Sequence, residues 1–179
     1  MEQFSDIELV AQAKEGSSEA FSALASRHYE TVYRTAFKWR PVKEDAEDIA
    51  QEVFVKLAKA IHGFKGQSAF KTWLYRVTMN SAKDFGRKSS NKQRYEEKFA
   101  EEAPNTSSDS ISEAKANPML QKALDRLSDK LKDALLLVVS EELSHKEASK
   151  ILDCSVATVA WRVFEAKKQL KEILGKSHG

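Results

Sequence analysis

Two groups of charged side chains of opposite sign follow one another in the first half of the chain. Residues 44–52 are rich in acids, whereas residues 65–94 contain eight lysines and arginines and a single acid. Asp45, Asp48 and Glu52 recur at i, i+3 and i+7, a spacing that places three carboxylates on one face of a helix. Carboxylates in such a row bind cationic protein surfaces, and clustered lysines and arginines bind phosphates. The pattern predicts noncovalent binding to two different partners.

The sequence lacks the residue patterns of catalysis and of metal binding. It contains no phosphate-cradling glycine motif and no nucleophile–base arrangement. The four histidines are scattered and Cys154 is the single cysteine, which argues against a zinc site and excludes an internal disulfide. We therefore expect a protein that is not an enzyme and that uses no cofactor or metal. Cys154 is either a small buried turn residue or a redox sensor.

A helix-turn-helix pattern lies near the end of the chain. Ser144 and Glu147 form a capping box that opens a short helix, and Asp153, a residue that tolerates left-handed backbone, follows in the turn. Ser155 caps a second helix over residues 156–174, which in this motif lies in the major groove of DNA. A plain helical hairpin with solvated lysines is the alternative.

The second helix of this motif carries an unusual set of outward residues. Trp161 is a base contact, an anchor for a protein partner or a partly buried core residue, and these three interpretations stay open. An acid such as Glu165 is repelled by phosphate unless it accepts a hydrogen bond from cytosine N4. The outward candidates are Ala157, Thr158, Ala160, Trp161, Arg162 and Glu165, followed by Lys167, Lys168 and Lys171 near the DNA backbone.

Helices must position both sets of side chains. Only six glycines and three prolines occur among 179 residues, and good helix formers dominate, so the fold class is all-α. Residues 5–88 show successive amphipathic helical patterns, with Pro41 ending one helix and Asp45 capping the next. Residues 91–117 are polar, with too little apolar surface to offset the entropy of ordering. We predict two small helical domains joined by a flexible linker.

Hydropathy also limits where the protein resides. No apolar run approaches the ~20 residues that a membrane span requires, and the N-terminus lacks the basic start and apolar stretch of a secretory signal. We expect a cytoplasmic protein without membrane insertion and without a small-molecule substrate.

Three segments resemble conserved regions of one bacterial family. Residues 45–57 (DAEDIAQEVFVKL) and 68–88 (SAFKTWLYRVTMNSAKDFGRK) resemble the second region of extracytoplasmic-function (ECF, group 4) sigma factors. Residues 144–170 (SHKEASKILDCSVATVAWRVFEAKKQL) resemble the fourth region. The resemblance covers both helical parts of the chain in the order that the family has.

This resemblance implies a function and a division of the chain. Region 2 is expected in residues 1–90, a flexible linker in 91–117 and region 4, with the helix-turn-helix, in 118–179. The protein is then an alternative sigma factor that binds core RNA polymerase, recognises the minus-ten and minus-thirty-five elements of promoter DNA, and opens the strands at the former. An anti-sigma factor is a further implied partner.

The resemblance also assigns roles to individual side chains. The acidic helix is implied to dock on the clamp helices of the largest catalytic subunit of the polymerase through Asp45, Asp48, Gln51, Glu52 and Phe54. The minus-ten element is assigned to Lys65, Gln67, Ser68, Arg76, Asn80, Lys83, Arg87 and Lys88. The minus-thirty-five element is assigned to Ser155, Thr158, Ala160, Trp161, Arg162, Phe164, Glu165 and Lys168. Phe70 and Trp73 either stack on DNA or belong to the core.

The chain departs from the family at several positions of region 4. Ser128 stands where a proline is common, Ala157 replaces a glycine, and Ala160 and Glu165 occupy positions that are commonly basic. Ala157 only favours helix, whereas Ala160 and Glu165 predict that the protein does not read the usual minus-thirty-five sequence. The main alternative is a two-domain regulator with a sensor lobe, which has no reason to carry the acidic helix beside the basic one; a nucleic-acid enzyme is the least supported.

Overall fold

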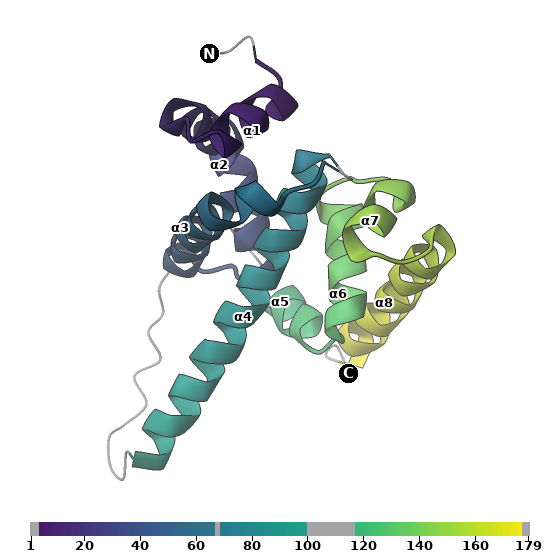
Figure 1. Ribbon diagram of the computed structural model, residues 1–179. Coiled ribbons are helices and arrows are strands. Elements are labelled where there is room, and N and C mark those ends of the chain that lie inside the picture. Colours follow the sequence, from purple (N-terminus) through teal and green to yellow (C-terminus); the bar gives the residue numbers. More distant parts are fainter. Residues whose placement is uncertain (1–3, 67–68, 100–116, 177–179) are drawn as a thin grey trace.

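The computed structural model describes residues 4–66, 69–99 and 117–176, and the regular elements in these ranges are all helical. The chain order is shown in Figure 1. The elements are α1 (Asp6–Lys14), α2 (Ser18–Trp39), α3 (Lys43–Ala60), the 3-10 turn η1 (Ile61–Gly63), α4 (Phe70–Phe99), α5 (Pro118–Asp125), α6 (Asp129–Leu135), the π-helical turn η2 (Leu136–Ser140), α7 (His145–Leu152) and α8 (Val156–Lys176). This architecture confirms the predicted all-α class with two helical domains.

The first domain packs α1–α4 around a common core. Ser5 and Glu8 form the expected capping box, and α2 ends at Trp39, just before Pro41. The prediction that Asp45 caps the next helix is wrong, because α3 begins at Lys43 with no side-chain cap. The Asp45 carboxylate instead accepts a hydrogen bond from the Arg40 guanidinium at 2.7 Å, which ties the start of α3 to the end of α2.

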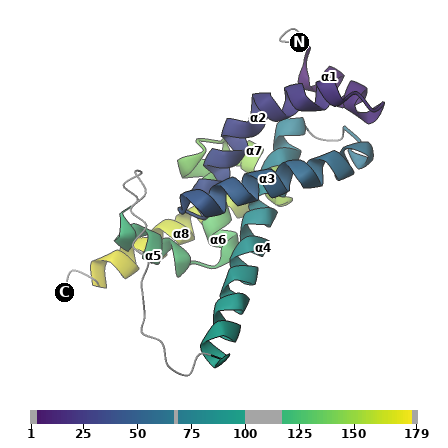
Figure 2. The same ribbon diagram turned by 90° about the vertical axis from the view of Figure 1, so that its left-hand side faces the viewer.

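The longest helix, α4, runs from the first domain along the second and continues beyond both. Its helical backbone extends to Phe99, past the domain boundary that we placed at residue 90. Apart from Tyr95, residues 92–98 are lysine, glutamine, arginine and glutamate, which favour helix, and the next proline of the chain stands only at Pro104. Figures 1 and 2 show the C-terminal part of α4 projecting past the neighbouring helices.

The second domain holds the predicted helix-turn-helix in α7 and α8. Ser144 and Glu147 form the capping box, and Asp153 adopts the left-handed conformation with φ 52° and ψ 52°. The Ser155 hydroxyl accepts a hydrogen bond from the Thr158 amide at 3.0 Å and caps α8. The helix α8 also packs against α5 and α6, so the motif is held by the rest of its domain.

The two domains lie against each other, with α4 facing α7 and α2 facing η2. The buried apolar residues of both domains form one connected cluster. Within the parts of the chain that the structure describes, no helix is both long enough and apolar enough to span a membrane.

Candidate protein- and nucleic-acid-binding surfaces

The outer face of α3 carries the predicted acidic row. Asp48 and Gln51 are exposed, and Glu52 is half-buried and forms an ion pair with Lys56 at 2.8 Å. Asp45 lies at the edge of this row, with its charge compensated by Arg40. Of these three carboxylates, Asp48 is therefore the one without an ion pair to a described residue.

An apolar strip beside the acids was not predicted. Val55 is 56% exposed and follows Asp48 by seven residues, so it continues the same face. Tyr29 of α2 is 42% exposed and stacks on half-buried Phe54, with ring centroids 6.1 Å apart. The exposed position of Val55 could have been read from the i, i+7 spacing, whereas Tyr29 is placed there only by the packing of α2 on α3.

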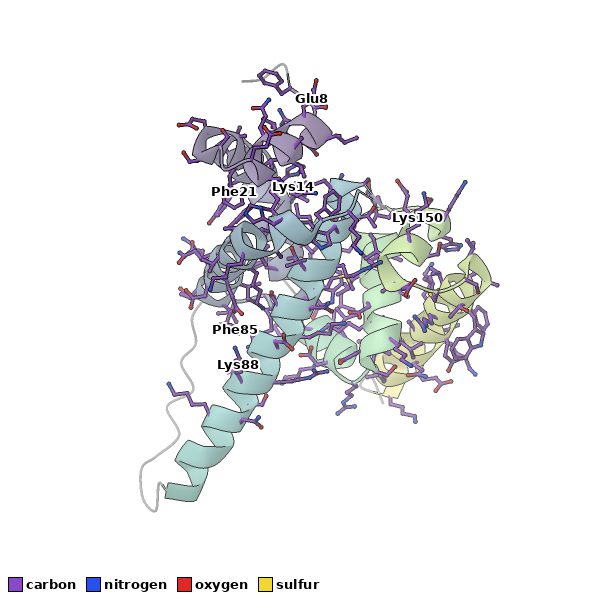
Figure 3. The ribbon with its side chains drawn as sticks, in the orientation of Figure 1. Glu8, Lys14, Phe21, Phe85, Lys88 and Lys150 are labelled. Carbon is purple, nitrogen blue, oxygen red and sulfur yellow. The ribbon has the colours of Figure 1, made fainter. Side chains whose placement is uncertain are left out.

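Four of the predicted minus-ten residues form one line along α4. Arg76, Asn80, Lys83 and Arg87 are separated by four, three and four residues, which puts them on a single helical face. This face meets the second domain. The Arg76 guanidinium donates to the main-chain oxygens of Lys150, at 2.7 Å, and Ile151, at 3.1 Å. Figure 3 labels Lys150 on α7, where that helix approaches α4.

The cations further along the line meet carboxylates of α6. The Lys83 ammonium lies 2.6 Å from the Asp133 carboxylate, and Arg87 lies 3.6 Å from Asp129. Asp133 also accepts a hydrogen bond at 2.8 Å from the indole N–H of buried Trp39. Arg76, Lys83 and Arg87, which were expected to contact DNA, are thus paired with the second domain. We call this arrangement, in which the two domains lie against each other, the closed arrangement.

Glu141, just after η2, makes a second polar contact between the domains. Its carboxylate lies 3.0 Å from the Lys38 ammonium and accepts a hydrogen bond from the Tyr75 hydroxyl at 3.1 Å. Burial, and then the adjacent negative charge of Glu141, raise the pKa of the Tyr75 phenol. Tyr75 therefore remains a hydrogen-bond donor at neutral pH.

The remaining minus-ten candidates lie in different surroundings. Lys65 and Lys88 are exposed, whereas Gln67 and Ser68 lie outside the described residues. Phe70 is 6% exposed and packs on Trp73 and on His28. This burial places Phe70 in the core, and half-buried Trp73 packs against that core.

The first half of α8 exposes a largely apolar face. Trp161 and Phe164 are 60% and 67% exposed, which excludes the core interpretation of Trp161. Ala160 is half-buried and Lys168 is exposed. Figure 3 shows α8 on the far side of the second domain from α4, with side chains that point outward from it.

The polar candidates of this helix are engaged locally. The hydroxyls of Ser155 and Thr158 lie 2.8 Å apart, and the Arg162 guanidinium turns back to the Cys154 sulfur at 3.6 Å. The Glu165 carboxylate accepts a hydrogen bond from the Gln169 amide at 2.9 Å. Cys154 itself is half-buried in the turn.

Two family profiles match the two domains. The profile described as "Sigma-70 region 2" matches residues 24–92, and that described as "Sigma-70, region 4" matches residues 118–170. The matched residues include α3, the line of cations on α4 and the helix-turn-helix. These features define a transcription initiation factor of the sigma class.

Relatives of similar length place the chain within that class. It is 33% identical over 182 residues to the ECF RNA polymerase sigma-E factor of Haemophilus influenzae, covering 95% of each chain. It is 31% identical over 180 residues to the corresponding Escherichia coli K12 protein, covering 94% of each. The chain therefore belongs to the ECF RNA polymerase sigma factors, and it is an alternative sigma factor that directs core RNA polymerase to promoter DNA for transcription initiation.

Solved structures share the fold. CnrH in complex with the cytosolic domain of CnrY superposes with a TM-score of 0.67 at 24% identity, covering 96% of this chain and 97% of that one. The sigma factor RpoE in complex with the anti-sigma factor NepR, from Bartonella quintana, gives a TM-score of 0.63 at 22% identity, covering 87% and 96%. Each of these chains is bound to a partner, and each shares the helical architecture described above.

Proposed function

We propose that this chain is a group 4 ECF sigma factor that docks on core polymerase through α3. The observation that carries the proposal is the acidic face of α3 next to the cationic line of α4 in one domain. A carboxylate row with exposed Val55 beside it fits a partner helix that presents basic and apolar side chains. The group 4 assignment is supported by the 25 residues from 93 to 117 between the matched regions, which are too few for a further domain of ~50 residues.

The line Arg76–Asn80–Lys83–Arg87 is proposed to hold the minus-ten element and to assist strand opening. Cations track phosphates, and the Asn80 amide is exposed and able to read an unpaired base edge. Because three of these side chains are paired with the second domain, the domains must separate before DNA can occupy this face. Exposed Lys65 precedes this line in the sequence and exposed Lys88 follows it, and both are proposed to contact phosphates of the same DNA element.

Promoter geometry leads to the same requirement. The minus-ten and minus-thirty-five elements are separated by about 25 base pairs, which is on the order of 85 Å along B-form DNA. A compact chain of this length has a radius of gyration of about 16 Å and cannot span that distance. Seventeen residues reach at most about 60 Å when extended, so the segment 100–116 is long enough to let the domains move apart.

The other proposed partner is an anti-sigma factor in the cytoplasm. A groove of about 530 Å³ lies between α2 and the second domain, lined mainly by apolar side chains that include Phe37, Leu120, Leu124, Val139 and Leu170. Such a groove fits the apolar face of an amphipathic helix. A protein bound there would contact both domains and hold them in the closed arrangement. The sigma factor itself acts by binding, and the polymerase supplies the chemistry.

Run-off transcription with purified core polymerase tests the proposed docking face. We expect discrete new transcripts from genomic fragments in the presence of this chain. Reversing two charges, with Asp48→Lys and Glu52→Lys, is expected to abolish core binding and transcripts because like charges then face the basic partner helix. Glu15→Lys, a reversal at an exposed residue at the end of α1, is the matched control and should leave transcription unchanged.

The two possible results are distinct. If the double variant binds core polymerase as tightly as the wild type, α3 is not the docking face. If neither the wild type nor the double variant produces a new start site with core polymerase, the chain does not act as a sigma factor in this assay. A conventional helix-turn-helix regulator then becomes the better assignment.

A further inference from the structure

We propose that Trp161 and Phe164 read thymine methyl groups in the major groove, so that promoter specificity at the upstream element depends on apolar contacts. This inference rests on the proposed DNA-binding role of α8 and names what that helix recognises. The two aromatic side chains are 60% and 67% exposed, far more than a core residue would be.

The aromatic pair lies on the side of α8 that points away from the domain. Ala157, Trp161, Phe164, Lys168 and Lys171 follow each other at intervals of four, three, four and three residues, which aligns them along one helical face. The buried residues of α8, which are Val159, Val163 and Ala166, occupy the opposite face. The five aligned residues from Ala157 to Lys171 form a stripe on the surface of α8, which is apolar in its first half and cationic in its second.

Charge around the stripe favours DNA as its occupant. Lys168 and Lys171 continue the stripe beyond the aromatic pair, and exposed Lys146 and Lys150 of α7 lie in the other helix of the motif. Cations around an apolar centre match a groove whose walls are phosphates and whose floor presents base edges. The thymine methyl is the apolar group that base pairs offer in the major groove.

Hydrogen-bonding readers are scarce on this part of α8. The Ser155 and Thr158 hydroxyls are paired with each other, and the Arg162 guanidinium is turned toward Cys154. Ala160 has no polar side-chain atom. The exposed side chains in the first nine residues of α8 are thus apolar: Val156 and Ala157 at the start of the helix, then the larger Trp161 and Phe164.

The test separates methyl recognition from all other contacts by exchanging thymine for uracil. Holoenzyme assembled from core polymerase and the full chain selects DNA from a promoter library with a fixed downstream element and a randomised upstream window. Uracil then replaces each thymine of the selected element in turn, which removes one methyl and keeps every hydrogen-bonding group. We expect one or more positions to lose about four-fold in affinity, the effect of about 0.8 kcal/mol for one buried methyl.

Two variants assign the effect to its residues. Trp161→Ala should bring the thymine-to-uracil ratio close to one at a sensitive position, whereas Lys168→Ala should weaken binding to all sequences and leave that ratio unchanged. Because Trp161 is largely exposed, its removal should not change the thermal melting temperature, and a melting curve checks this.

Three outcomes overturn the inference while leaving the sigma assignment intact. The first is a wild-type holoenzyme that initiates at the fixed element but tolerates uracil at every upstream position. The second is Trp161→Ala retaining the wild-type ratio. The third is Trp161→Ala losing affinity for core polymerase or an anti-sigma protein with unchanged DNA preference, which would make the stripe a protein-binding surface. Failure of the holoenzyme to initiate at all would instead refute the proposed function.

Discussion

Replacing Lys83 by methionine should loosen the contact between the two domains. Lys83 belongs to α4 in the first domain, and its ammonium lies 2.6 Å from the Asp133 carboxylate of the second. The Asp133 side chain is only 7% exposed, so loss of the cation leaves a nearly buried carboxylate whose remaining hydrogen-bond donor, among the described residues, is the indole N–H of Trp39. Methionine keeps most of the length and the apolar stem of the lysine.

The magnitude follows from the burial of the two partners. A hydrogen bond to a charged group contributes about 1.5–3 kcal/mol, and breaking a fully buried ion pair costs about 3–5 kcal/mol. The Lys83 side chain is 23% exposed, so solvent screens part of the interaction and the lower range applies. We expect about 2 kcal/mol, which shifts the equilibrium between closed and open domains about 30-fold toward the open state.

Hydrogen exchange of the Trp39 indole proton measures this shift. The proton is buried in the contact between the domains and exchanges when they part, so its exchange rate should rise about 30-fold in Lys83→Met. The chain has three tryptophans, which makes the indole resonances simple to assign by NMR. Lys88→Met is the matched control, because Lys88 is an exposed lysine on the same helix.

Two results would refute this reasoning. Exchange within two-fold of the wild-type rate in Lys83→Met would mean that the ion pair does not hold the domains together. An equal acceleration in Lys88→Met would mean that the loss of any positive charge from α4 is sufficient, without a specific pair.

Two further predictions concern the helix-turn-helix. Hydrogen bonds from the Ser144 side chain and amide lower the pKa of Glu147 below its ordinary value of 4.5, so this carboxylate stabilises the fold at neutral pH and the contribution is lost as the pH falls below about 4.5. Melting temperatures of wild type and Glu147→Gln should therefore differ most at pH 7 and converge as the pH falls through the lowered pKa of Glu147; a constant difference would contradict the assignment. Asp153→Val should lower the free energy of unfolding by about 1–2 kcal/mol in urea titration because a β-branched residue opposes left-handed backbone, whereas Asp153→Gly should not destabilise.

Local features of this protein were predictable from the sequence because neighbouring residues produce them. Ser144 with Glu147 specified the start of α7, Asp153 specified the left-handed corner, and the spacing of Asp48 and Glu52 specified a common helical face. Each depends on atoms within about one helical turn. The start of α3 was mispredicted because Asp45 had a stronger local alternative in the cation of Arg40.

Residues distant in the chain decided the rest. Nothing near Lys83 or Trp39 in sequence indicates Asp133, which is placed between them by the packing of α6 against the first domain. The exposure of Trp161 could not be inferred either, since a tryptophan on an amphipathic helix satisfies core and surface patterns alike. Composition and periodicity determine which helices form and which faces are apolar; long-range packing determines which charges meet and which aromatic side chains remain exposed to solvent, because those contacts join segments that share no local signal.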